Sequence, residues 1–130
     1  MTVPLLFRVI LPTDDVERDV RFYATVLGHE GERIAPRRHY FYCGPTILAI
    51  VDPREHDAAA PVRPNVEHVY FSVAGIDAAY AAARRAGCSW LEDRVRKRDW
   101  GERSFYARDP FGNPICFVEE KTAFTGGGRA

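Results

Sequence analysis

The chain has 130 residues, 46% of them hydrophobic, and its 18 basic and 18 acidic side chains give a formal net charge of zero. This length fits one domain with one core, and the apolar content excludes a disordered protein. Because its charges balance, the chain lacks the excess of basic residues expected of a nucleic-acid-binding protein. Residues 93–99 are locally basic but bracketed by acids, so we expect a solvated loop there, with a site for an anionic ligand as the alternative.

The sequence also lacks the marks of a membrane or disulfide-rich protein. No segment approaches the ~18 apolar residues that a membrane span needs, and the first residues do not form a signal peptide. The three cysteines, Cys43, Cys88 and Cys116, are odd in number and far apart, which argues against a disulfide framework or a zinc knuckle. We therefore expect a reduced, cytoplasmic protein with no membrane partner.

The first half predicts a strand, a helix and a hairpin. Residues 5–11 form an apolar strand-like run. Asp14 followed by Glu17 predicts a capping box, and Gly28 stands where a helix ends. The helix between them has one apolar face, made by Val16, Val20, Tyr23 and Leu27. Residues 39–52 then predict a hairpin across Gly44-Pro45.

The second half follows a linker. Residues 53–65 are rich in proline and alanine, which is typical of a linker. Residues 67–73 predict a strand, and a helix runs from Ile76 to Arg85 before Gly87. Strands at residues 104–108 and 114–119 flank a turn whose chemistry comes from Asp109, Pro110, Gly112 and Asn113.

The two halves repeat each other. Arg8 and His68 lie 60 residues apart in the first strand of each half, and the helix starts and ends repeat at nearly the same offset. The alternative is an ordinary α+β domain with coincidental similarity. We predict an α+β fold of two tandem βαβββ modules in a single domain, with modules at residues 4–52 and 66–121, a linker at residues 53–65 and a flexible tail at residues 122–130.

This duplicated pattern resembles the vicinal oxygen chelate superfamily, which includes glyoxalases, bleomycin resistance proteins and extradiol dioxygenases. Three stretches carry the likeness: DDVERDVRFYATVLG (14–28), HVYFSVAGIDAAYAAARRAG (68–87) and WGERSFYARDPFGNPICFVEE (100–120). The resemblance implies half-barrel sheets with helices on the outside and a small molecule or a metal in the concavity. It also implies a homodimer that pairs the open edges of the half-barrels.

The metal-binding members of the superfamily take ligands from four repeat-related positions, which here hold Arg8, Ala49, His68 and Cys116. A guanidinium is a fixed cation and alanine has no donor atom, so neither can bind a metal. Glu119 does not replace them, because alternation along the strand points it away from Cys116. We therefore expect no metal and no other cofactor, and we interpret Cys116 as part of the pocket wall.

The same alternation predicts the rest of the lining. If Arg8 faces the concavity, Phe7, Val9 and Leu11 pack under the helices. The inward set is then Leu6, Arg8, Ile10, Ile47, Ala49, Val51, His68, Tyr70, Ser72, Cys116 and Val118. Such a lining suits an aromatic or aliphatic ligand with one acidic or hydrogen-bonding group. Trp90 and Trp100 flank the basic loop near the expected pocket mouth, where either could stack on a planar ligand or simply pack.

Several roles remain open from the sequence. Arg8 can form an internal or interface ion pair, or it can bind an acidic ligand group. His68 can be a general base or a structural histidine, and Cys116 is a nucleophile only if its pKa is depressed. The remaining histidines, His29, His39 and His56, are expected on the surface.

The leading hypothesis is a metal-free small-molecule-binding protein that sequesters an aromatic or apolar compound, as bleomycin-type resistance proteins do. Arg8 in the pocket favours a neutral or anionic ligand over a cationic drug. The alternative is a lyase, isomerase or dioxygenase, with or without a metal, in which His68 is the base and Arg8 stabilises an oxyanion. A third possibility is a vestigial pocket in a dimeric partner of another protein. The sequence does not identify the ligand, the process or the type of dimer.

Overall fold

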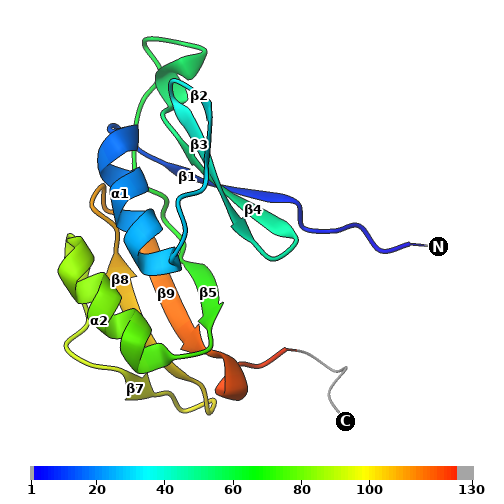
Figure 1. Cartoon of the computed structure of the whole chain (residues 1–130), viewed down its shortest axis with the longest axis vertical. Coiled ribbons are helices and arrows are strands. Elements are labelled where there is room, and N and C mark those ends of the chain that lie inside the picture. Colours follow the sequence, from blue (N-terminus) through cyan, green and yellow to red (C-terminus); the bar gives the residue numbers. More distant parts are fainter. Residues whose placement is uncertain (1, 126–130) are drawn as a thin grey trace.

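The computed structural model describes residues 2–125, in which two modules stand one above the other (Figure 1). The first comprises β1 (Arg8–Pro12), α1 (Val16–Leu27), β2 (Glu32–Ala35), β3 (Arg38–Cys43) and β4 (Thr46–Val51). The second comprises β5 (Val69–Val73), α2 (Ile76–Ala86), β6 (Trp90–Leu91), β7 (Arg96–Lys97), β8 (Arg103–Arg108) and β9 (Pro114–Glu119). Short 3₁₀ helices, η1 (Pro53–Glu55) and η2 (Glu120–Thr122), follow β4 and β9.

The two sheets have the same topology, which confirms the α+β prediction and the repeat. Their strand orders are β1-β4-β3-β2 and β5-β9-β8-β6, with β7 pairing β8. In each module the first strand runs parallel to the last, with Ile10 opposite Ala49 and Tyr70 opposite Cys116. Ile10 and Tyr70 are themselves 60 residues apart, so the register of the sheets keeps the offset of the sequence.

Helix α1 begins one residue later than the predicted capping box. Asp15 is the N-cap, and its carboxylate accepts a hydrogen bond from the backbone N–H of Arg18 at 3.1 Å. Asp14 instead forms an ion pair with the Arg18 guanidinium at 2.7 Å. A cap must reach the third N–H of the helix, and only Asp15 stands at that distance. The helix ends as predicted, at Gly28 with φ 79°.

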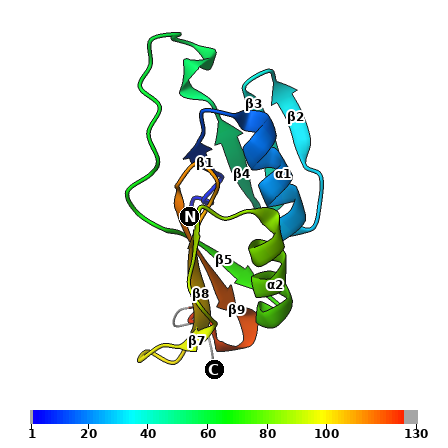
Figure 2. The same cartoon turned by 90° about the vertical axis from the view of Figure 1, so that its left-hand side faces the viewer.

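The two helices lie side by side and cover the same face of both sheets (Figures 1 and 2). The rings of Phe71, Phe117 and Phe105 stack in the part of the core that the second module contributes, at centroid distances of 5.1 and 5.0 Å. Leu11 is buried beneath the helices as expected. Phe7 is not: 58% of it is exposed, because it precedes β1 in the N-terminal segment that leaves the sheet.

A buried turn joins the modules. Asp109 and Asn113, in the turn between β8 and β9, have no exposed surface. The hydroxyl of Tyr23 on α1 donates to Asp109 Oδ2 at 2.7 Å, and Asn113 Nδ2 donates to the carbonyl of Pro12 at 2.8 Å. The backbone N–H of Asn65 donates to Asn113 Oδ1 at 2.8 Å. The turn therefore fixes how the second module sits against the first.

The basic stretch at residues 93–99 lies at the surface as expected, but it is tethered to the second sheet and is not a free loop. It contains β7, and Arg98 donates to Ser104 Oγ at 2.8 Å and to Glu92 Oε2 at 3.1 Å. The guanidinium of Arg98 also lies 4.8 Å from the centre of the Tyr106 ring. Alternating arginine and acid in one hairpin favours local ion pairs over an open loop.

Two further expectations need comment. His39 is not on the surface: it lies in β3 with 7% of it exposed, and its Nε2 is 2.9 Å from the carbonyl of Glu30. The expected tail at residues 122–130 begins at the end of η2, and residues 126–130 lie outside the described part of the chain. Among residues 2–125, no helix has the length and apolar character required to cross a bilayer.

Candidate functional site

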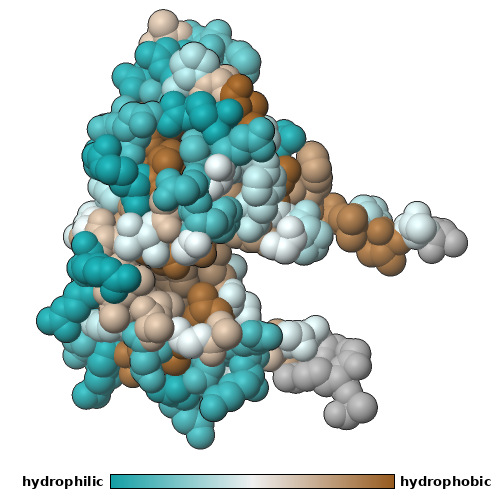
Figure 3. All heavy atoms as spheres, viewed as in Figure 1, coloured by the Kyte–Doolittle hydropathy of each residue, from teal (hydrophilic) through white to brown (hydrophobic). Residues whose placement is uncertain are grey.

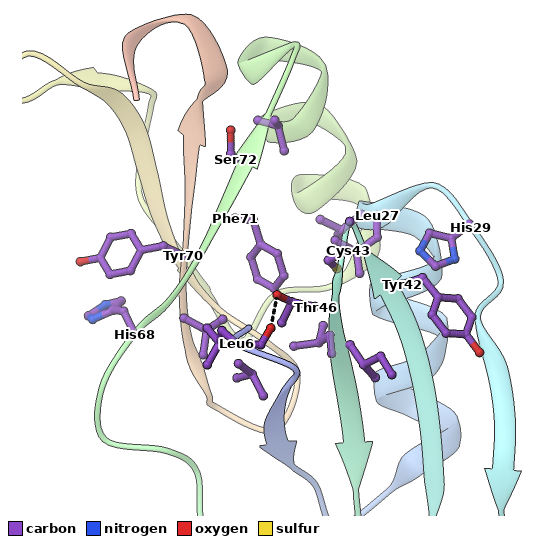
Figure 4. Close-up of a pocket in the computed structure, with 17 residues that line it drawn as sticks. Leu6, Leu27, His29, Tyr42, Cys43, Thr46, His68, Tyr70, Phe71 and Ser72 are labelled. Atoms are coloured by element: carbon purple, nitrogen blue, oxygen red, sulfur yellow. Dashed lines mark hydrogen bonds between the residues drawn. The ribbon is translucent and has the colours of Figure 1, made fainter. Parts of the chain in front are cut away.

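An apolar cleft of about 720 Å³ lies between the two modules. Figure 3 shows apolar residues gathered in this hollow between the upper and lower lobes. The lining comes from the N-terminal segment, the end of α1, the β3–β4 hairpin and β5 (Figure 4). None of its 17 lining residues is an aspartate, glutamate, lysine or arginine. The cleft therefore favours a ligand whose buried part is uncharged and largely apolar.

The cleft follows the open edge of β5. Among the described residues this strand pairs only with β9, so its other edge faces the cleft. Val69 and Phe71 point toward the core, whereas Tyr70 and Ser72 point to the opposite face by alternation, and all four line the cleft. Both faces of the strand contribute because the cleft wraps around its edge.

The polar side chains that line the cleft include those of two histidines and two tyrosines. His68 lies directly before β5, with its ring centre 5.0 Å from that of Tyr106 and 6.2 Å from that of Tyr70. The imidazole nitrogens of His68 make no hydrogen bond within residues 2–125, so both are available to a ligand. His29 and Tyr42 lie toward the other end of the cleft (Figure 4). The Tyr42 hydroxyl donates a hydrogen bond to the Glu32 carboxylate.

The sequence placed only part of the lining correctly. Leu6, Ile47, His68, Tyr70 and Ser72 line the cleft as predicted. The predicted members outside the cleft lining are Arg8, Ile10, Ala49, Val51, Trp100, Cys116 and Val118. Alternation is correct for their strands, but the two sheets of one chain do not close on a shared cavity, because the turn between β8 and β9 stacks the modules end to end.

The predicted residues outside the cleft fall into three groups. Arg8 and Ile10 lie on the exposed face of the first sheet, where 47% of Ile10 is accessible. Ala49, Val51, Cys116 and Val118 are buried. Trp100 is 63% exposed near the tip of the hairpin after β7, away from the cleft, and its indole N–H donates to Glu102 at 2.8 Å.

The sequence analysis missed the residues that reach the cleft from the end of α1 and from β3. These include Val26, Leu27, His29, Tyr42 and Cys43. The sequence gives only a weak indication of these residues. Leu27 and His29 flank Gly28, which predicts the end of the helix but not which strand packs against that end. Contact with β5 depends on how the modules stack, and a local pattern does not encode that.

Arg8 forms no ion pair with any described residue, so the internal ion pair considered above is wrong. Its guanidinium carbon lies 4.9 Å from the centre of the Phe7 ring and 5.1 Å from that of Tyr40. The residue is exposed, so its charge keeps its hydration and needs no internal partner. Two aromatic faces hold the cation over the sheet.

The family model described as the Glyoxalase/Bleomycin resistance protein/Dioxygenase superfamily matches residues 5–117. The chain belongs to this superfamily. Membership agrees with the two βαβββ modules, because the matched range begins before β1 and ends within β9, the last strand of the second repeat.

Solved structures share the superfamily fold. A glyoxalase/bleomycin resistance protein from Albidiferax ferrireducens T118 is 24% identical with a TM-score of 0.73, covering 87% of this chain and 96% of its own. A lactoylglutathione lyase from Agrobacterium tumefaciens is 24% identical with a TM-score of 0.70, covering 93% and 97%. A glyoxalase-related enzyme from Fulvimarina pelagi is 18% identical with a TM-score of 0.78, covering 98% and 96%. No curated protein matches the chain.

The donor atoms at the four metal positions of the superfamily do not fit a metal here. Arg8 is a cation, and Ala49 has no donor. Burial raises the pKa of the Cys116 thiol to about 11, although Ser104 and Arg98 oppose the shift, so the thiol stays protonated at neutral pH. Within residues 2–125 no three His, Cys, Asp or Glu side chains are grouped to hold an ion. That leaves His68 alone with a usable donor at these positions.

Proposed function

We propose that the protein binds a small aromatic or apolar compound in the cleft along β5 and holds it without a metal. The observation that carries this proposal is an apolar cleft without aspartate, glutamate, lysine or arginine, in a protein whose four metal positions lack a donor set. Sequestration of this kind is what a resistance protein needs, because the compound is removed from its target by binding alone.

The size and the rings of the cleft support an aromatic ligand. Its volume of about 720 Å³ falls within the range of roughly 300–1,000 Å³ that small-molecule pockets occupy. Tyr42, Tyr70 and Phe71 present aromatic surface, and His29 and His68 add rings with polar atoms. Offset or edge-on contacts between such rings and a planar ligand add to the burial of its surface.

A thermal-shift panel on EDTA-treated protein tests the proposal. Aromatic acids, aromatic amides and aromatic antibiotics are compared with divalent metals. A ligand at a hundred times its dissociation constant adds about 2.7 kcal/mol of stability, which raises the Tm visibly. We expect stabilisation by an aromatic compound and none by metals. Stabilisation by a transition metal alone would contradict the proposal.

A cleft-filling variant ties the binding to this site. Ser72→Trp places a large ring at an exposed position in the cleft, and we expect it to abolish the ligand-dependent shift. Thr25→Trp, on the exposed surface of α1, is the matched control and should keep the shift. Equal loss in both variants would mean that the compound binds elsewhere.

The second candidate function is a lyase or isomerase reaction. Its specific support is His68, whose unpaired imidazole nitrogens border the cleft and can accept a proton. One structural neighbour is a lactoylglutathione lyase, which adds a reason to test for turnover. A His68→Ala variant separates the two functions, with His56→Ala as control, because His56 is exposed and outside the cleft lining. Catalysis predicts that conversion of the bound compound collapses only in His68→Ala, whereas sequestration predicts a partial loss of affinity and no product in the wild-type protein.

A further inference from the structure

Arg8 stands at the rim of the cleft although it is not part of the lining. On β4 its partner across the ladder is Ile47, whose partner on β3 is Tyr42. Both partners line the cleft, and so do Val9, the next residue along β1, and Leu6, in the segment before β1. The neighbours of Arg8 along β1 and across the ladder therefore line the cleft, although Arg8 itself does not.

The hydrogen-bonding capacity of Arg8 is unused. Within residues 2–125 its guanidinium makes no hydrogen bond or ion pair, and it lies over the rings of Phe7 and Tyr40. By contrast, Arg38 on the same face pairs with Glu55 at 2.7 Å, and Arg98 on the second sheet pairs with Glu92. The aromatic faces restrict the Arg8 side chain while leaving its N–H groups free, which lowers the entropy lost when it binds an anion.

We propose that the compound bound in the cleft carries a carboxylate and that Arg8 binds this group at the rim. The inference rests on the proposed function, because it names the acidic group of the ligand whose body occupies the cleft. Guanidinium and carboxylate match as planar two-point partners. Across the sheet from Arg8, beyond Ile47, the Tyr42 hydroxyl donates to the Glu32 carboxylate. The negative charge of Glu32 repels an anionic group at that end of the cleft. The ligand is thereby oriented with its acid toward β1 and its rings toward β5.

The test compares a matched pair of probes, naphthoate and naphthamide, which share the ring system and differ in charge. Binding is measured by calorimetry to the wild-type protein and to Arg8→Gln, which removes the charge but keeps a polar side chain. Arg84→Gln is the control, because Arg84 is an exposed arginine on α2 and its replacement changes the net charge equally. All three proteins are also compared by Tm, so that misfolding is recognised.

We expect the wild-type protein to bind naphthoate more tightly than naphthamide by about tenfold or more. Arg8→Gln should remove this preference while binding naphthamide unchanged, and Arg84→Gln should keep it. If Arg8→Gln binds naphthoate as the wild type does, the role of Arg8 is refuted while the cleft remains a binding site. If the wild-type protein binds neither probe at millimolar concentration, the proposed function fails together with the inference.

Discussion

Cys116 lies in the middle of β9 with 1% of its surface exposed. Burial raises the pKa of its thiol to about 11, so the reactive thiolate is scarce at neutral pH. Tyr70 and Tyr106 stand opposite it on the two neighbouring strands. A side chain in this position fills space between larger rings, which is a structural role and not that of a nucleophile.

Thiol labelling checks this role. In a variant with Cys43→Ser and Cys88→Ser, we expect the remaining Cys116 to react with a disulfide reagent at pH 8 on the order of a hundredfold more slowly in the native than in the unfolded protein. A variant that keeps only the half-buried Cys43 should react faster than the Cys116 variant. Rapid native labelling of Cys116 would show that the strand opens or that the thiol is activated.

Asp19 is a buried carboxylate in the first module, and one of its oxygens lacks a hydrogen-bond partner among the described residues. It is 1% exposed, its Oδ1 accepts from Arg18 Nε at 3.0 Å, and its Oδ2 has no hydrogen-bond partner among the described residues. Burial, with a smaller contribution from the Asp109 carboxylate, raises its pKa from 3.8 to about 6. The folded state therefore holds the proton more tightly than the unfolded chain, and stability present below pH 4 is lost as the pH rises through 6.

We predict that Asp19→Asn raises the free energy of unfolding by about 1–3 kcal/mol above pH 6, because the amide carries no charge to bury. The difference between variant and wild type should vanish below pH 4, where Asp19 is protonated in both states. Asp14→Asn is the control: Asp14 pairs with the same arginine but is exposed, so we expect a change of less than about 0.5 kcal/mol. Urea unfolding across pH 4–8 measures this, and a uniform loss of stability in Asp19→Asn would contradict the explanation.

At the scale of elements, the turn between β8 and β9 joins the two modules through hydrogen bonds of buried side chains. Asn113 uses its whole side-chain amide: Nδ2 donates to Pro12 and to Asp109 Oδ2, and Oδ1 accepts from Asn65. Removing this amide leaves buried polar groups without partners, which costs more than the bonds contribute.

Asn113→Ala should therefore lower the free energy of unfolding by roughly 2–4 kcal/mol. Asn65→Ala is the matched control, because the Asn65 side chain makes a single exposed bond to the carbonyl of Ile10 at 3.2 Å, and we expect a loss below about 1 kcal/mol. Urea denaturation of both variants measures the difference. Similar losses would mean that the turn does not hold the modules together.

The long elements were predictable from the sequence, whereas their arrangement was not. The helices and the hairpin strands show clear periodicity, and the helices end at glycines. Their predicted bounds therefore agree with the observed ones within a few residues. The two-residue strands β6 and β7 are too short to show a period. The cleft was only partly predictable, because alternation identifies one face of β4 and β5 whereas the cleft takes residues from both faces of each strand. What faces them depends on bonds such as Asn113 to Pro12, 101 residues apart, which no local pattern encodes.

At the scale of the whole molecule, the chain leaves unusual apolar surface uncovered. Leu5 and Leu6 are 77% and 71% exposed in the N-terminal segment, which projects away from the body (Figures 1 and 3). Phe7 and Ile10 continue this surface onto β1, and Tyr70 and Trp90 are half exposed on the second sheet. Apolar surface of this kind marks an interaction site. A second copy of the chain, with its open sheet faces, is the partner that we propose.

We predict that the protein is a homodimer at micromolar concentration and that the N-terminal segment holds it. Burying a leucine side chain contributes about 1.5–3 kcal/mol, so replacing both leucines in Leu5→Asp/Leu6→Asp should weaken the dimer by at least about a hundredfold. Ile34→Asp is the control, because Ile34 is 45% exposed on β2, at the opposite edge of the first sheet from β1. Sedimentation equilibrium distinguishes the 14.7 kDa monomer from the dimer. A wild-type monomer at high concentration would refute the dimer, and an unweakened Leu5→Asp/Leu6→Asp dimer would show that other surfaces form it.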